Sequence, residues 1–209
     1  LAGTMAITLA AACVTAQNGS NSPYSRYGFG TLNDRAQGFN KAMAGTALGF
    51  REATEINFQN PASYSATDSL SMLFDIGLTF QNANFKQGDL KKNAHNTTVD
   101  YLNMAFRAWR NVGMSIGLMP YSSVGYKFTN KQTMPDIDGG GEKSASTTYN
   151  GDGGLHEVYL GMGWKFAKNL SIGANLGYLW GDYTHSVRAS FSDTNIRQYA
   201  RVYSADIST

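Results

Sequence analysis

The 209-residue sequence has one cysteine, little charge and no long apolar run. A single cysteine excludes a disulfide framework and a cysteine-based zinc site. No window holds the ~18 consecutive apolar residues of a membrane-spanning helix. The charged fraction is 15% and the formal net charge is +2, which excludes a charged disordered tail and the clustered basic face of a nucleic-acid-binding protein. Glycine and aromatics are abundant instead, with 23 Gly, 11 Phe and 12 Tyr. These features leave an all-β chain, soluble or membrane-embedded.

The amino end is uncharged and almost wholly apolar or small over residues 1–14. Val14, Thr15 and Ala16 then fit a small-residue cleavage site. We predict that residues 1–16 are a signal peptide that is truncated at its start, and that the mature protein is exported. Two alternatives are a lipidation box at residues 10–13, which lacks its usual leucine, and a buried helix.

Apolar residues alternate with polar or small residues in five segments of the chain. A period of two is typical of a strand with one apolar face. The sequence therefore predicts five strands, over residues 70–80, 102–108, 112–118, 158–166 and 170–180.

The second face of these strands favours a membrane barrel over a soluble sandwich. It is largely Gly, Ser, Asn and Ala, as expected of a crowded polar lumen. Aromatic residues near strand ends fit interfacial girdles; the candidates are Trp109, Trp164, Phe166, Tyr178 and Trp180. We predict a transmembrane antiparallel β-barrel. The alternative is a soluble, lipid-binding barrel with ordinary core aromatics.

The links between the predicted strands alternate in length. Residues 109–111 and 167–169 are tight turns, whereas residues 82–98, residues 129–154 and the chain after residue 181 are longer and polar. Outer-membrane barrels have short periplasmic turns and long extracellular loops. The first strand is therefore expected to start on the periplasmic side.

The segment over residues 17–67 lacks a sustained period but is too rich in Tyr, Phe and Gly for a linker. Because it precedes a strand that starts from the periplasm, we predict that it is a plug folded into the lumen. Residues 68–209 then form the first five or six strands of the barrel wall. A barrel needs about eight strands to close, so we expect the sequence to be the front part of a chain about twice as long.

Three stretches resemble the amino-terminal hatch of the FadL family of outer-membrane transporters. They are residues 38–47 (GFNKAMAGTA), Glu52-Ala53 and residues 57–62 (NFQNPA), and the triplet Asn60-Pro61-Ala62 is the most specific element. The predicted hairpins over residues 102–128 and 156–183 resemble that family's strands two and three and strands four and five. The match extends over residues 22–183 as a pattern and is typical of a divergent branch.

The resemblance implies a fourteen-stranded barrel whose third strand kinks and leaves a lateral opening. Pro120 lies directly after the apolar run of the third predicted strand, and Gly125 follows. Proline cannot donate to the ladder of a sheet, so residues 119–125 are the candidate kink. The alternative is that Pro120 marks the point where the strand leaves the membrane.

Three charged residues on the predicted lumen face are candidate ligand contacts: Asp75, Arg107 and Glu157. Arg107 is the first choice for an anionic headgroup, because guanidinium binds carboxylate in a bidentate manner. The alternative is that these charges pair with one another or with the plug.

The sequence carries no pattern of catalysis, of a metal site or of cofactor binding. His95, His156 and His185 are scattered, and the residues near His156 lack the second histidine of a metalloprotease helix. We therefore predict a protein that is not an enzyme, that has no cofactor and that does not bind nucleic acid.

The function implied by the resemblance is passive transport of long-chain fatty acids or other hydrophobic compounds across a Gram-negative outer membrane. Its partners would be outer-membrane lipid and a hydrophobic ligand such as a fatty acid. The alternative is a non-transporting barrel that serves as a subunit of an outer-membrane secretion or assembly complex, with outer-membrane proteins as partners.

Overall fold

The computed structural model describes residues 22–135, 142–191 and 199–208. The predicted signal peptide and its two alternatives lie outside these residues. No helix in the described part of the chain is long and apolar enough to span a membrane. The elements are η1 (Pro23–Arg26), β1 (Thr31–Leu32), α2 (Gly38–Ala42), η2 (Pro61–Ala66), β2 (Met72–Gln87), β3 (Leu90–Trp109), β4 (Val112–Pro135), β5 (Glu142–Ala167), β6 (Leu170–Phe191) and β7 (Tyr199–Ser208).

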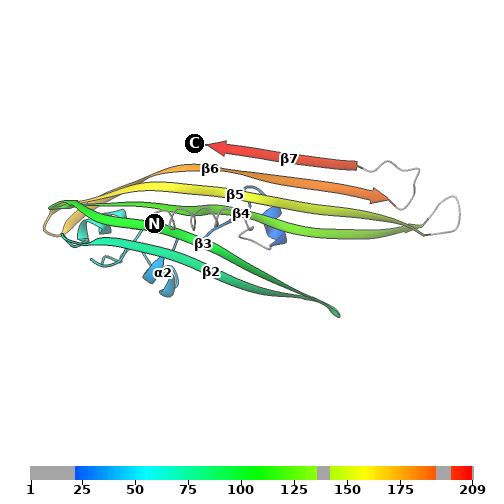
Figure 1. Cartoon of the computed structure of the whole chain (residues 1–209), viewed down its shortest axis with the longest axis horizontal. Helices are drawn as coiled ribbons and strands as arrows, with labels where there is room; N and C mark the ends of the chain where they lie inside the picture. Colours follow the sequence, from blue (N-terminus) through cyan, green and yellow to red (C-terminus); the bar gives the residue numbers. More distant parts are fainter. Residues whose placement is uncertain (1–21, 136–141, 192–198, 209) are drawn as a thin grey trace, which may run out of the picture.

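The strands form one antiparallel sheet, which confirms the all-β prediction. Strands β2 to β7 follow one another in chain order, and the short β1 pairs with β4. Figure 1 shows the long strands side by side, with β2 at the lower edge and β7 at the upper edge. The sheet is open: among the described residues, β2 and β7 each pair with one neighbour. The described strands therefore form an open sheet, and the structure does not show the closed fourteen-stranded barrel that the resemblance implies for the full chain.

The strands run further than the alternating pattern predicts. Residues 82–98 form a paired hairpin extension of β2 and β3, closed between Gln87 and Leu90. Strands β4 and β5 are likewise paired from Thr129 and Thr148 out to Pro135 and Glu142. The prediction of polar loops was wrong at these places and also directly after residue 181, where β6 continues to Phe191. Backbone pairing maintains a strand even where neither face has to be apolar, so the period of two disappears before the strand ends.

The outer face of the sheet is apolar and exposed. Its large exposed side chains belong to β2, β3, β4, β5 and β6, and include Phe74, Ile76, Leu102, Ile116, Leu118, Leu160, Met162, Trp164, Ile172 and Leu176. A contiguous apolar surface of more than a few hundred Å² usually marks contact with a membrane or another protein. Most of the predicted girdle aromatics, including Trp109 and Tyr178, are exposed on the same strands.

The inner face, defined here as the face that contacts residues 22–67, is lined by glycine where η2 lies on it. Gly113, Gly163 and Gly173 stand opposite one another across β4, β5 and β6. A Cβ atom on each of them would collide with backbone atoms of η2. The small residues of this face therefore allow a helical turn to lie directly against the sheet.

Two buried clusters lie on the inner face, and the first holds the amino-terminal segment there. The first joins Ile56, Phe58 and Tyr64 to side chains of β3, β4 and β5, including Tyr159, which is 1% exposed. The second lies further along the strands and contains Val124, Tyr126, Leu155 and Tyr183. A bulge between Pro120 and Ser122 changes which β4 residues face inward. Met119 is buried before the bulge, and Val124 and Tyr126 are buried after it.

Candidate functional site

The sheet divides into two leaves between β3 and β4. Their pairing runs from Trp109 opposite Val112 to Leu102 opposite Leu118 and ends there. From Tyr101 back to Leu90, β3 pairs only with β2 among the described strands, while β4 stays paired with β5. Figure 1 shows the β2–β3 hairpin diverging from β4 beyond this point. We call this line of separation the seam.

The seam begins at the residues predicted to form a kink. Pro120 is the second residue after the last β3–β4 pair, and Gly125 lies within the stretch of β4 that β3 has left. Pairing with β5 continues on the other side, interrupted by the bulge at Tyr121. A lateral opening for a hydrophobic substrate stays a prediction at this position.

The amino-terminal segment takes the place of β3 along this edge of β4. Strand β1 pairs there, with Thr31 opposite Ser123 and Leu32 opposite Ser122. The next residue, Asn33, donates its backbone N–H to the Tyr121 carbonyl oxygen at 3.0 Å. The edge that would otherwise carry unpaired backbone groups is thus satisfied by another part of the chain.

Side chains satisfy the two ends of the same edge. The Asn33 amide Nδ2 donates to the Pro120 carbonyl oxygen at 3.4 Å. At the other end, the Gly125 backbone N–H donates to Ser25 Oγ at 3.1 Å. Gly30 lets the segment approach this closely, because it has a φ of +93° and a Cβ there would lie 2.5 Å from the Ser123 carbonyl oxygen.

Residues 35–41, the bridging segment, connect the two leaves of the sheet. Arg35 forms an ion pair of 2.7 Å with Glu157 on β5, and Lys41 forms one of 2.6 Å with Asp100 on β3. Asp100 is the bulge residue of β3, since the register with β2 shifts at that point. It also accepts a hydrogen bond of 2.5 Å from Thr79. One ion pair therefore links each leaf of the sheet to the bridging segment.

Gln37 lies between these ion pairs and contacts both sides of the seam. Its Oε1 accepts a hydrogen bond of 2.6 Å from Asn103 on β3, and its Nε2 lies 3.8 Å from the sulfur of Met119 on β4. Gln37 is 2% exposed. This buried amide therefore contacts both leaves of the sheet, as the two partly exposed ion pairs together do.

Gly38 anchors the start of α2 on the β3 side of the seam. Its backbone N–H donates to the Tyr101 hydroxyl at 2.7 Å, and its φ is +47°. Glu55 is close by, and burial raises the pKa of its carboxyl, with further contributions from the charges of Asp75 and Glu52. Negative charge therefore gathers beside the bridging segment.

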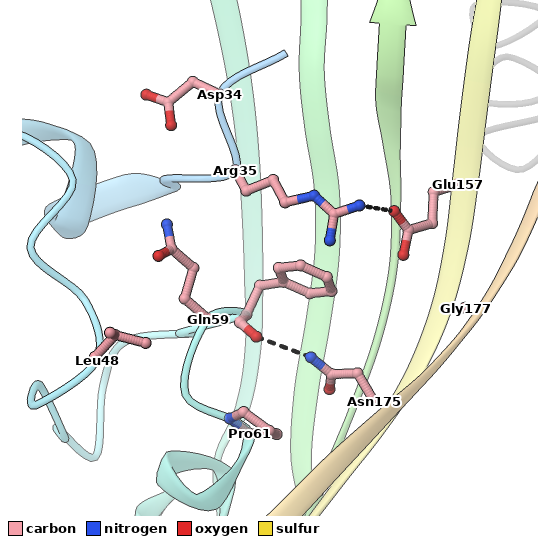
Figure 2. Close-up of a pocket in the computed structure, with 9 residues that line it drawn as sticks. Asp34, Arg35, Leu48, Gln59, Pro61, Glu157, Asn175 and Gly177 are labelled. Carbon is pink, nitrogen blue, oxygen red and sulfur yellow. Dashed lines mark hydrogen bonds and ion pairs between the residues drawn. The ribbon is translucent and has the colours of Figure 1, made fainter. Parts of the chain in front are cut away.

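A cavity of about 480 Å³ lies next to the Arg35–Glu157 ion pair (Figure 2). Figure 2 shows Arg35 pointing across to Glu157, and Asn175 reaching the segment that carries Gln59. The Asn175 Nδ2 donates to the Phe58 carbonyl oxygen at 2.8 Å. The lining residues are Asp34, Arg35, Leu48, Phe58, Gln59, Pro61, Glu157, Asn175 and Gly177.

The cavity is a polar site with both signs of charge. Asp34 and Glu157 supply carboxylates and Arg35 a guanidinium group. Among the described residues no group of three or more His, Cys, Asp or Glu side chains has an arrangement that holds a metal ion. The lining suits water or a polar chain segment better than a long acyl chain, which has no polar groups to pair.

The structure brings only some of the predicted site residues to this cavity. Glu157 and Pro61 line it. Asn60 precedes η2, and its Nδ2 donates to the Phe50 carbonyl oxygen at 3.3 Å. Ala62 meets the glycine row at Gly173. The Asn60-Pro61-Ala62 triplet therefore begins η2 and contacts the inner face of the sheet.

The other two predicted contacts lie elsewhere. Arg107 is opposite Gly113 near the end of β3, and its buried Nε has no hydrogen-bond partner among the described residues. Asp75 is opposite Asn103 beside Gly38. Neither lines the cavity. Sequence reasoning did not single out Arg35, because only the fold shows that a charge in the amino-terminal segment meets Glu157.

A comparison with protein families identifies one match that covers nearly the whole chain. A family model described as BamG matches residues 3–208. BamG is a family distinct from FadL, so the assignment to a divergent FadL branch was wrong. The short hatch-like stretches and the strand pattern were not specific enough to separate two families. No curated protein and no solved structure matches the chain.

Proposed function

The chain belongs to the BamG family, and we propose that it is a non-catalytic subunit of a machine that assembles outer-membrane proteins. The family is associated with the outer-membrane assembly machinery of Gram-negative bacteria. This is the alternative that the sequence left open, and it replaces fatty-acid transport as the main function. The family match over residues 3–208 is the observation that carries the proposal.

The outer face of the sheet supports a position in the membrane. Phe74, Ile76 and Phe80 are 67%, 61% and 76% exposed on β2, and Leu176 is 76% exposed on β6. Transfer of such an apolar face from water into lipid is favourable, because its apolar side chains are removed from water. Because open sheet edges are not tolerated in lipid, we propose that in the membrane β2 and β7 each pair with a further strand of a closed barrel.

The inner face supports a role without transport. We propose that residues 17–67 form a plug, of which residues 22–67 lie against the wall formed by residues 68–209. The cluster around Tyr64 and the ion pairs of the bridging segment hold the plug in place. The cavity that remains is lined by Asp34, Arg35, Gln59, Glu157 and Asn175. Among the described residues, the inner face is covered by residues 22–67 and its cavity is lined by charged and amide side chains, which favours a role other than transport of a hydrophobic compound.

Purification from outer membranes in a mild detergent tests the proposal. We expect a tagged protein to purify with outer-membrane partner proteins at a fixed stoichiometry, and to keep them in a second column step. Purification as a single species that carries fatty acid would overturn the proposal. An unrelated outer-membrane barrel with the same tag is the control for partners that are retained non-specifically.

A further inference from the structure

The edge of β4 that faces the seam accepts an added strand. Over residues 120–125 it offers backbone groups that β3 has left unpaired. Strand β1 pairs with this edge in antiparallel register at Ser122 and Ser123. The edge is therefore competent for strand addition in the conformation that the structure shows.

Strand β1 covers only a short part of this edge. Strand β1 has two residues, and Leu32 is 63% exposed. At Pro120 and Gly125 the partner atoms come from the side chains of Asn33 and Ser25, where a longer strand would supply its backbone. An extended peptide of six or more residues would make a full ladder along the same edge.

The surroundings of the edge define the chemistry of its ligand. Leu118, directly before the edge, is 40% exposed on the outer face, and Ser122 and Ser123 are buried at the edge itself. A strand added here would place one set of side chains beside the apolar outer face and the alternate set toward the inner face, where Ser122 is buried. That alternation of apolar and small polar residues is the pattern of an outer-membrane β-strand.

We propose that this edge of β4 binds an extended strand of an outer-membrane β-barrel polypeptide during assembly, and that the strand displaces β1. The inference rests on the proposed function, since it names the substrate class of the assembly machine. The ion pairs of Arg35 and Lys41 hold the two leaves while β1 is in place. Both pairs are partly exposed, so their release has a small free-energy cost.

A disulfide lock tests the displacement of β1. Thr31→Cys with Ser123→Cys joins a cross-strand pair of β1 and β4. The control is Thr129→Cys with Thr148→Cys, which joins β4 to β5 at a pair whose hydroxyl oxygens lie 3.0 Å apart. Both variants carry Cys13→Ala and are prepared as the full chain in its detergent-solubilised complex.

The probe is a synthetic peptide that copies residues 170–181, LSIGANLGYLWG, with a photoreactive benzophenone residue in place of Leu176. A second peptide with proline at alternate positions cannot pair. Adducts are mapped by mass spectrometry. We expect labelling of residues 120–125 that falls about tenfold when the β1–β4 lock is oxidised, equivalent to about 1.4 kcal/mol, and that returns on reduction. The β4–β5 lock should leave labelling unchanged.

A second variant keeps the test independent of disulfide formation. Gly30→Val places side-chain atoms against the Ser123 carbonyl oxygen and Val124, so β1 should leave the edge and labelling should rise. The inference would be overturned if the extent of labelling changed neither with the oxidised lock nor with Gly30→Val, or if only β7 were labelled. Partner proteins should co-purify with every variant; their absence from the wild-type protein would count against the proposed function instead.

Discussion

Arg35 and Glu157 are 122 residues apart in the chain, yet their side chains form an ion pair of 2.7 Å. The pair ties the bridging segment to β5 and forms one wall of the cavity. Glu157 is the better shielded partner, with a side chain that is 11% exposed against 44% for Arg35. Arg35 also lies over the rings of Phe58 and Tyr121, at 5.5 and 5.1 Å.

Removing this ion pair should loosen the amino-terminal segment without unfolding the sheet. We expect Arg35→Met to increase hydrogen exchange in residues 33–38 by an amount equivalent to about 1 kcal/mol, because the pair is partly exposed. Adding Glu157→Gln should cost little more, since the two changes remove one interaction. Arg110→Met on the exposed turn after β3 is the matched control. Additive effects of the two substitutions would contradict the coupling.

The glycine row predicts a steric effect on η2. A Cβ on Gly113 would collide with the Tyr64 carbonyl group, and backbone atoms cannot move aside as a flexible side chain does. We expect Gly113→Ala to lower stability by about 1–3 kcal/mol and to expose residues 61–66 to protease. Gly49→Ala is the control, because a Cβ there has open space. Equal stability of the two variants would show that η2 does not lie on this row.

His185 predicts a loss of stability in acid. His185 lies on β6 outside residues 170–180, the stretch predicted to cross the membrane. Burial lowers its pKa below the ordinary value of 6.5, and the charge of Arg26 lowers it further. The unfolded chain therefore binds the proton more readily, so stability declines as the pH falls below about 6.5 towards the folded pKa. The ring nitrogen Nδ1 of His185 lies 2.7 Å from the hydroxyl oxygen of Tyr126. Tyr126 belongs to the stretch of β4 that no longer pairs with β3.

Thermal melts of detergent-solubilised protein at pH 5 and pH 8 provide the measurement. We expect His185→Gln, which does not titrate, to reduce the difference between the two melting temperatures. His95→Gln on the β2–β3 hairpin controls for the loss of a histidine. If His185→Gln left the difference between the melting temperatures at pH 5 and pH 8 unchanged, His185 would not be the cause of the loss of stability in acid.

The alternating pattern predicted the strands well because one face of the sheet is consistently apolar. Residues 170–180, for example, lie within β6, and residues 112–118 begin β4. The same reasoning missed the extension of β2 and β3 over residues 82–98, since backbone pairs such as Asn82 with His95 need no apolar face. Sequence period reports side-chain environment and not backbone pairing.

The candidate site was only partly predictable. Glu157 was identified as a charge on the inner face, but its partner Arg35 lies in a segment without a regular period. The seam depends on the point where β3 leaves β4, and Pro120 marked its position without indicating that β1 would occupy the edge. Contacts between distant segments depend on the register of the whole sheet, which short motifs do not encode.

Depletion of the protein in the native bacterium, followed by quantification of folded outer-membrane barrels, measures whether the protein acts in the assembly of those barrels. Folded barrels resist dodecyl sulfate at room temperature and migrate differently after boiling, so both forms are measured on one gel. We expect depletion to lower the folded fraction of several outer-membrane barrels while uptake of long-chain fatty acid per cell is retained. An unchanged folded fraction together with a loss of fatty-acid uptake would contradict this expectation.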